Sequence, residues 1–158
     1  MATQSDAAAG AASSQDPPFL VTLPDSVKES YPFLLRKASQ RITERAHEAL
    51  VPFGLTLRHY GVLNLVGLEE GQIQRVVGAR LGIDRTTVVG LADDLEDAGL
   101  LERRRGPDRR SFALYLTERG VAQLWQLRRL IDLVQEEFLA PLSEDEREEL
   151  RGLLLRVL

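Results

Sequence analysis

The sequence contains no cysteine, which excludes disulfides, thiolate metal sites and thiol-based redox sensing. Its only two histidines, His47 and His59, are twelve residues apart on different predicted helices, and such a pair carries little weight as a metal site. There is no nucleophile with a paired base and no glycine-rich phosphate loop. We therefore expect no metal, no cofactor and no enzymatic activity.

Long apolar runs are also missing, because no window reaches the roughly 18 consecutive apolar residues that a membrane span needs. The first seventeen residues are rich in Ala, Ser, Gln and Asp and contain neither the basic nor the apolar region of a signal peptide. They resemble a disordered tail. These features and the lack of disulfides fit a cytoplasmic protein that has no membrane partner.

Lysine is scarce, with 2 Lys against 18 Arg, and the net charge is −4. A negative chain argues at first against a nucleic-acid partner, because phosphate binding needs a basic surface. The charge is segregated, however: residues 102–110 carry +3 and residues 144–151 carry −3. A basic binding head on an acidic body would show this distribution.

The N-terminal half has the apolar spacing of helices. Apolar residues recur at three- and four-residue steps over residues 31–50, which predicts a helix there. A shorter helix start lies at Ser26, with Glu29 in capping-box spacing. Thr56 is expected to cap the next helix.

Residues 71–99 predict two helices joined by a tight turn. The first is weak, because glycines flank or interrupt it and Ile73 stands where a capping hydroxyl would help. The second has Asp84 as its N-cap and Gly99 as its stop. Two helices in this arrangement are typical of a helix-turn-helix.

Two short strands follow, over residues 100–104 and 112–116, with Gly106-Pro107-Asp108 as strong turn chemistry between them. A helix-turn-helix followed by a hairpin with a basic tip is a winged helix-turn-helix. The predicted fold is therefore mainly α with a small β-hairpin wing, an α+β winged helix.

The C-terminal part predicts two more helices. Thr117 caps the first, Gly120 is a weak spot in its first turn, and apolar residues then recur in heptad-like steps. Such a stripe is ordinarily the core of one chain. Because about 20 helical residues span about 30 Å, more than the small head beside them, we expect part of the stripe to need a second copy and Trp125 to pack between helices. Ser143 caps the last helix.

The helix from Asp84 offers few but suitable groups for DNA. Arg85 can donate to guanine or phosphate, the hydroxyls of Thr86 and Thr87 can serve base or phosphate, and Val89 can touch a thymine methyl. Asp93 and its neighbour Asp94 would repel phosphate. This leaves most of the electrostatic attraction to the hairpin.

A basic run such as RRRGPDRR is often only a solvated surface, but two details favour DNA. Arg103 and Arg105 share one face of an edge strand and Arg104 the other, so at least one is well placed for phosphates. Asp108 lies two residues before Arg110 and can hold its guanidinium toward a narrow minor groove.

Several segments together carry a family resemblance. They are GLTLRHYGVLNLV, Gln74, LGIDRTTVVGLADDLEDAGLLERR and DRRSFALYLTERG. The Asp-x-Arg wing followed at a fixed distance by LTERG is the specific part. Over roughly residues 30 to 158 the chain resembles the MarR family of bacterial transcriptional regulators.

The resemblance implies a homodimer with interlocked N- and C-terminal helices and two winged heads on a pseudo-palindromic, inverted-repeat operator in double-stranded DNA. Family members usually repress, and many release DNA when a small amphipathic or phenolic effector binds. We expect a disordered tail over residues 1–24, a dimerisation helix over 25–55, the DNA-binding domain over 56–117 and C-terminal dimerisation helices over 118–158.

By position, the resemblance assigns DNA contacts to Gln74, Thr86 and Thr87 and a wing pair to Asp108 and Arg110. The full predicted DNA-binding set is Gln74, Arg85, Thr86, Thr87, Val89, Arg103, Arg105, Asp108, Arg109 and Arg110. The chain departs from the family where many relatives have arginine at Gly90 and a polar residue at Val76. We therefore expect a different target sequence or weaker binding.

An effector pocket is predicted less directly. The residues expected to line the crevice where family members bind ligands are Tyr31, Phe33, Arg36, Arg58 and His59. Alternatively, the aromatic residues belong to a dimer core, and Arg58 and His59 are partly exposed.

A competing hypothesis is a winged-helix protein-interaction module that has lost specific DNA binding. It is suggested by Gly90, Asp93, Asp94 and the overall acidity.

Overall fold

The computed structural model describes residues 23–106 and 111–158. The predicted N-terminal tail lies almost wholly outside these residues, and so do Pro107, Asp108, Arg109 and Arg110 at the predicted hairpin tip. The chain forms two compact units, Met1–Gln40 and Arg41–Leu158.

The first unit contains α2 (Asp25–Lys28) and the first half of α3 (Tyr31–Leu50), which continues into the second unit. The bounds of α3 are those predicted from apolar spacing. The capping box predicted at Ser26 is wrong. Pro24 is the N-cap of α2, and its carbonyl accepts the N–H groups of Val27 and Lys28, which places Ser26 inside the helix.

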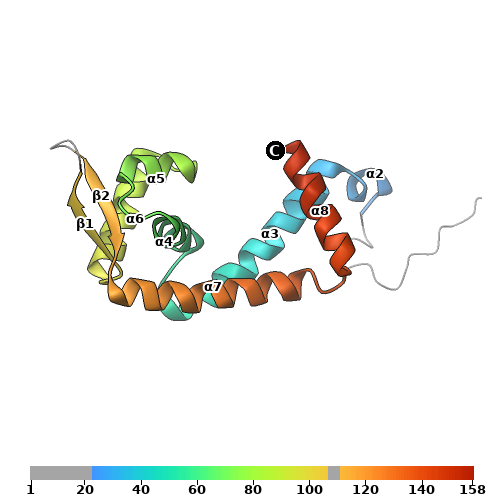
Figure 1. The fold of residues 1–158 in the computed structure, drawn as a ribbon. Coiled ribbons are helices and arrows are strands. Elements are labelled where there is room, and N and C mark those ends of the chain that lie inside the picture. The colour runs from blue at the N-terminus through green and yellow to red at the C-terminus, as the bar shows by residue number, and fades with distance from the viewer. Residues whose placement is uncertain (1–22, 107–110) are drawn as a thin grey trace, which may run out of the picture. The chain divides into compact units, whose positions relative to one another are not determined.

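In its described residues, the second unit consists of helices and one antiparallel hairpin, which confirms the predicted fold class (Figure 1). After a short 3₁₀ turn, η1, three helices precede the strands and two follow them. The elements are η1 (Val51–Phe53), α4 (Leu57–Leu68), α5 (Gln74–Arg80), α6 (Arg85–Asp97), β1 (Leu101–Arg105), β2 (Phe112–Leu116), α7 (Glu118–Phe138) and α8 (Glu144–Val157).

Side-chain caps explain where most of these helices begin. Thr56 forms a capping box with His59, Asp84 accepts two backbone N–H groups of α6, Thr117 accepts from Gly120, and Ser143 forms a capping box with Glu146. Each predicted cap in the second unit is therefore confirmed. As expected, α5 has no side-chain cap at Ile73.

The hairpin supports the weakly capped α5. Its strands pair from Leu101 opposite Leu116 to Arg105 opposite Phe112. On its other edge, β2 is joined to the segment before α5, because the Leu114 N–H donates to the Gln72 carbonyl at 3.0 Å and the Leu114 carbonyl accepts the Gly71 N–H at 2.9 Å. The wing is thereby fastened to the start of the helix-turn-helix.

The apolar stripe of α7 is buried within this chain. Leu124, Leu127, Ile131 and Val134 all belong to the main core, which also contains Leu50 at the end of α3. The expectation that part of this stripe needs a second copy is therefore wrong for these four residues, and for Phe138, the half-buried last residue of the stripe, it stays a prediction. A heptad-like repeat shows which face of a helix is covered, but it does not show which chain covers it.

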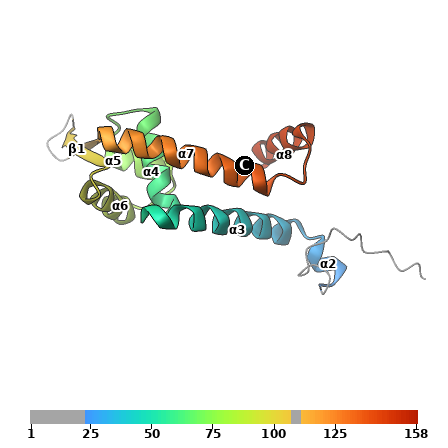
Figure 2. The ribbon, with the colours of Figure 1, turned by 90° about the horizontal axis from the view of Figure 1, so that it is seen from below.

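The start of α7 packs tightly against the base of the hairpin (Figure 2). A Cβ added to Gly120 would lie 1.9 Å from the carbonyl oxygen of Leu100. The Thr117 hydroxyl donates to the Gly99 carbonyl at 2.7 Å, and the Thr117 N–H donates to the Leu100 carbonyl at 3.2 Å. Gly120, predicted as a weak spot, is therefore the residue that allows this approach.

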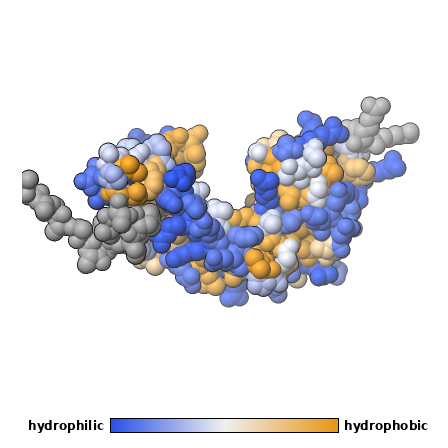
Figure 3. Space-filling model, turned by 180° about the vertical axis from the view of Figure 1, so that it is seen from behind, coloured by the Kyte–Doolittle hydropathy of each residue, from blue (hydrophilic) through white to orange (hydrophobic). Residues whose placement is uncertain are grey.

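Apolar side chains also reach the surface. Trp125 is 65% exposed, so within the described part of this chain it does not pack between helices as predicted. Helix α8 has no buried residue, and Leu153 and Val157 are exposed on it. The space-filling view shows apolar residues in several places among hydrophilic ones (Figure 3). Among the helices described, none is both long and apolar enough to cross a membrane.

Candidate nucleic-acid interface

Helix α6 presents one buried and one open face. Leu91, Ala92 and Leu95 face the core, whereas Thr86 and Gly90 are exposed on the opposite side. A Cβ at Gly90 would meet nothing within 4 Å. The outward side of this helix is therefore smooth and accessible near its N-terminal half.

The N-cap of α6 fixes the direction of its first hydroxyls. Asp84 accepts the N–H groups of Thr86 and Thr87 at 2.9 and 3.0 Å and the Thr87 hydroxyl at 2.5 Å. These hydrogen bonds lower the pKa of Asp84, and the bond from the Thr87 hydroxyl has the largest effect. Since the Thr87 hydroxyl gives its proton to Asp84, its remaining capacity is to accept, and Thr86 is the freer of the two.

A cleft of about 820 Å³ lies between the start of α5, the open side of α6 and the hairpin. It brings together four of the predicted DNA-contacting residues with the exposed ring of Phe112. These four are Gln74, Arg85, Val89 and Arg103. Of the six other predicted contacts, Asp108, Arg109 and Arg110 lie outside the described residues, so their roles stay predictions.

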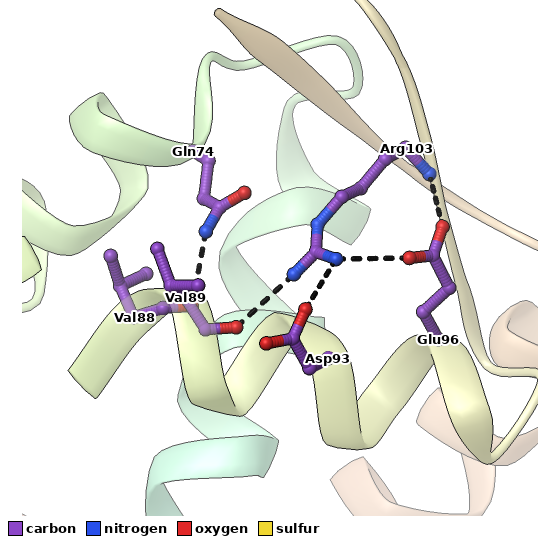
Figure 4. Close-up of polar contacts among 6 residues, drawn as sticks. All are labelled: Gln74, Val88, Val89, Asp93, Glu96 and Arg103. Carbon is purple, nitrogen blue, oxygen red and sulfur yellow. Dashed lines mark hydrogen bonds and ion pairs between the residues drawn. The ribbon is translucent and has the colours of Figure 1, made fainter. Parts of the chain in front are cut away.

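Gln74 is nearly buried, with 8% of its surface exposed. Its amide nitrogen donates to the Val88 carbonyl at 3.4 Å (Figure 4). The side chain thus joins the two helices of the helix-turn-helix, and a contact of Gln74 with DNA stays a prediction.

Arg103 reaches from β1 across to α6 (Figure 4). Its Nη1 donates to Asp93 Oδ1 at 2.5 Å and to Glu96 Oε2 at 3.0 Å, and its Nη2 donates to the Val89 carbonyl at 3.1 Å. Only 15% of the side chain is exposed. The structure therefore places the side chain of Arg103, a predicted DNA contact, against α6, the second helix of the helix-turn-helix.

The next two arginines of β1 are more accessible. Arg104 lies over the ring of Tyr115, 4.1 Å from its centroid, and its Nε donates to Glu102 at 2.8 Å. Arg105 is exposed, and no carboxylate within the described part of the chain pairs with it. Of the three consecutive arginines, Arg105 is thus the one best placed for a phosphate.

Asp93 and Asp94, the acids predicted to repel phosphate, each contact a side chain of another element. Asp93 pairs with Arg103, and Asp94 Oδ2 lies 3.2 Å from Nε2 of His59 on α4. Asp93 is therefore paired with a cation from the hairpin, and Asp94 has a hydrogen-bonding partner on α4. Sequence reasoning missed both pairs, although the three-residue spacing of Asp93 and Glu96 was a signal that one cation could reach both.

Comparison with known proteins identifies the family. A model of the MarR family matches residues 53–111. The crystal structure of a MarR-family transcriptional regulator from Rhodococcus sp. RHA1 is 30% identical, with a TM-score of 0.78, over 85% of this chain and 96% of that one. The chain belongs to the MarR family. It is a winged helix-turn-helix transcriptional regulator and not an enzyme.

Two further relatives of this MarR-family chain are informative. CouR from Rhodococcus jostii RHA1 bound to p-coumaroyl-CoA is 28% identical, with a TM-score of 0.75, over 85% of this chain and 95% of that one. The repressor CouR bound to a 23-mer DNA duplex is 31% identical, with a TM-score of 0.79, over 84% and 95%. A proposed transcriptional regulatory protein for the hcr operon of Thauera aromatica is 33% identical over 66% of this chain, and the match spans 63% of that protein, less than two thirds.

The residues predicted to bind an effector fall in both units of this MarR-family chain. In the first unit, Tyr31 is 80% exposed and the Arg36 guanidinium lies 5.6 Å from the ring centroid of Phe33. In the second, Arg58 is exposed and His59 is buried. A site shared by these five residues stays a prediction.

Both ring nitrogens of His59 have partners within the second unit. Its Nδ1 accepts the Thr56 N–H at 3.1 Å, and its Nε2 faces Asp94. The ring therefore joins the cap of α4 to the recognition helix. His59 stands three residues after the N-cap Thr56, the position that completes a capping box, and this spacing was a sequence signal for a structural role.

A polar cluster between α4 and α7 was also missed. Arg128 Nε donates to Asn64 Oδ1 at 2.8 Å. Burial, and then the nearby Asp132 carboxylate, raise the pKa of Tyr60. Within the described residues there is no group of three or more His, Asp or Glu side chains that could hold a metal ion.

Proposed function

We propose that this chain is a homodimeric repressor that binds an inverted-repeat operator and is released from it by a small phenolic or amphipathic ligand. The observation that carries the DNA-binding part is the open side of α6, with Thr86 and Gly90 exposed beside the hairpin and its flanking acids already paired. Such a helix can enter the major groove without presenting Asp93 as a free charge.

In this proposal the contacts divide between helix and wing. Arg85 and Thr86 supply hydrogen bonds at the start of α6, and Val89 supplies an apolar contact to a thymine methyl. Arg105 contacts the phosphate backbone. The wing pair Asp108 and Arg110 reads the minor groove. The likeness to the CouR structure that holds a DNA duplex supports this division.

The second copy is proposed to cover apolar surface that this chain leaves open. Trp125 and Leu133 on α7 are more than half exposed, and Leu153 and Val157 on α8 are also exposed. Exposed apolar surface of this kind marks an association site. A dimer would place two winged heads on two half-sites about 10 bp, or one helical turn, apart.

The effector is proposed to be a phenolic or other aromatic acid or its thioester, bound near Tyr31, Phe33, Arg36, Arg58 and His59. This proposal is supported by the relative CouR, whose structure holds p-coumaroyl-CoA.

Footprinting on the DNA upstream of the gene tests the proposal. We expect an inverted repeat to be protected at low salt, and protection to be lost with at least one member of a panel of aromatic acids and their CoA thioesters. Arg110→Ala should abolish protection while leaving the dimer intact in analytical ultracentrifugation, and Arg36→Ala should affect release by the ligand alone. No protection of any fragment would instead support a winged-helix interaction module.

A further inference from the structure

We propose that Arg103 is a positioning residue that clasps the wing to the recognition helix and makes no contact with DNA. The proposal rests on the proposed DNA-binding function of this face, and it changes the role of an arginine that the sequence assigns to phosphate. It also gives Asp93 and Glu96 a role, because their carboxylates become the fixed points to which the wing is attached.

The contacts of Arg103 extend along two turns of α6. They join the Val89 carbonyl to the Glu96 carboxylate, whose residues are seven positions apart, or about 10 Å along the helix axis between their Cα atoms. A guanidinium has donors fixed in one plane, so three acceptors define its orientation closely. With 15% of the side chain exposed, little of it is left to meet a phosphate.

Glu96 binds both the backbone and the side chain of Arg103. Its Oε1 accepts the Arg103 N–H at 3.0 Å, while its Oε2 accepts from Arg103 Nη1 at 3.0 Å. One carboxylate therefore fixes both the position of β1 and the direction of its arginine. The distance between β1 and α6 is set by this pair at the middle of the proposed interface.

The clasp also determines the charge that DNA would meet. Asp93 and Glu96 lie on the edge of α6 that faces the hairpin, and their side chains are 54% and 40% exposed. Without Arg103, two carboxylates would stand unpaired beside the phosphates. Its loss therefore both frees the wing and adds repulsion, and each effect lowers affinity for the operator.

Lysine at this position separates positioning from phosphate contact. Arg103→Lys keeps the charge, which a phosphate contact can use, but loses the planar fork that joins three acceptors. We expect Arg103→Lys and Arg103→Ala each to weaken operator binding roughly tenfold or more. Arg103→Lys should leave the slope of log affinity against log salt unchanged. Arg105→Ala, the matched control on the same strand, should reduce that slope by about 0.9.

A second measurement needs no DNA. In the free protein, both Arg103 variants and the pair Asp93→Asn with Glu96→Gln should speed amide hydrogen exchange in β1 and β2, whereas Arg105→Ala should not. Wild-type affinity in Arg103→Lys, with a slope reduced by about 0.9 in Arg103→Ala, would overturn the proposal in favour of a phosphate contact. Unchanged exchange in all Arg103 variants would also overturn it. If the wild-type protein binds no DNA, the proposed function fails, while the exchange experiment still decides whether Arg103 holds the wing.

Discussion

Gly90 offers the sharpest test of whether the open side of α6 meets DNA. The residue is exposed in the middle of the helix, and an added Cβ would meet nothing within 4 Å. A side chain at this position therefore starts into open space at its Cβ. We expect Gly90→Arg to bind the operator more tightly than the wild-type protein at low salt, because it adds a cation in the middle of a face that carries Arg85 at its start and hydroxyl and apolar groups beside it.

The expected magnitude has two parts that a control variant separates. Glycine in a helix interior costs about 1 kcal/mol relative to alanine, so Gly90→Ala and Gly90→Arg should both raise the free energy of unfolding by about that amount. Only Gly90→Arg adds a phosphate contact, which steepens the slope of log affinity against log salt by about 0.9. Between 50 and 200 mM salt, its affinity should fall about 3.5-fold more than that of Gly90→Ala.

Fluorescence anisotropy with a labelled operator duplex, titrated at four salt concentrations, measures both variants. Thermal unfolding without DNA verifies the shared gain in stability. If both variants gain stability but Gly90→Arg has the slope of Gly90→Ala, the outward side of α6 does not lie against phosphate, and the proposed docking of this helix is wrong.

Three further predictions concern the scaffold. Gly120→Ala should lower the free energy of unfolding by about 1 to 3 kcal/mol or more, because its Cβ would overlap the Leu100 carbonyl; a melting temperature equal to the wild-type value would contradict the close approach. The lowered pKa of Asp84 means that its capping contribution to stability is present above its ordinary pKa of 3.8 and is lost as pH falls through the lower folded pKa. The difference in the free energy of unfolding between wild type and Asp84→Ala, measured by urea unfolding, should therefore shrink in acid. A difference that does not change with pH would count against the cap. The raised pKa of Tyr60 favours its neutral form, so the associated stability is present below pH 10 and is lost as pH rises through the folded pKa. In an absorbance titration, Tyr60→Phe should remove an ionisation that lies above pH 10, and a titration curve that loses its part below pH 10 instead would contradict the raised pKa.

Local signals in the sequence predicted most element boundaries. Thr56, Asp84, Thr117 and Ser143 each cap the helix assigned to them, because a cap depends on residues within one turn. The strands were also predictable, since alternation and turn residues are local. The first was placed one residue early, at Leu100 instead of Leu101.

The candidate site was harder to predict because its contacts join distant segments. Alternation along β1 separates the face of Arg103 from that of Arg104, but it does not show that α6 lies opposite with two acids. The same limit applies to His59, whose partner Asp94 is 35 residues away. For α7, spacing identified the buried stripe but not the residues that cover it.

The contact of Gly120 with Leu100 has a mechanical consequence. Backbone meets backbone there, with no side chain between them that could rotate or compress. The hydroxyl of Thr117 adds a second attachment to the same turn. A tilt of α7 must therefore carry the base of β1 with it, so the long helix acts as a lever whose short arm is the wing.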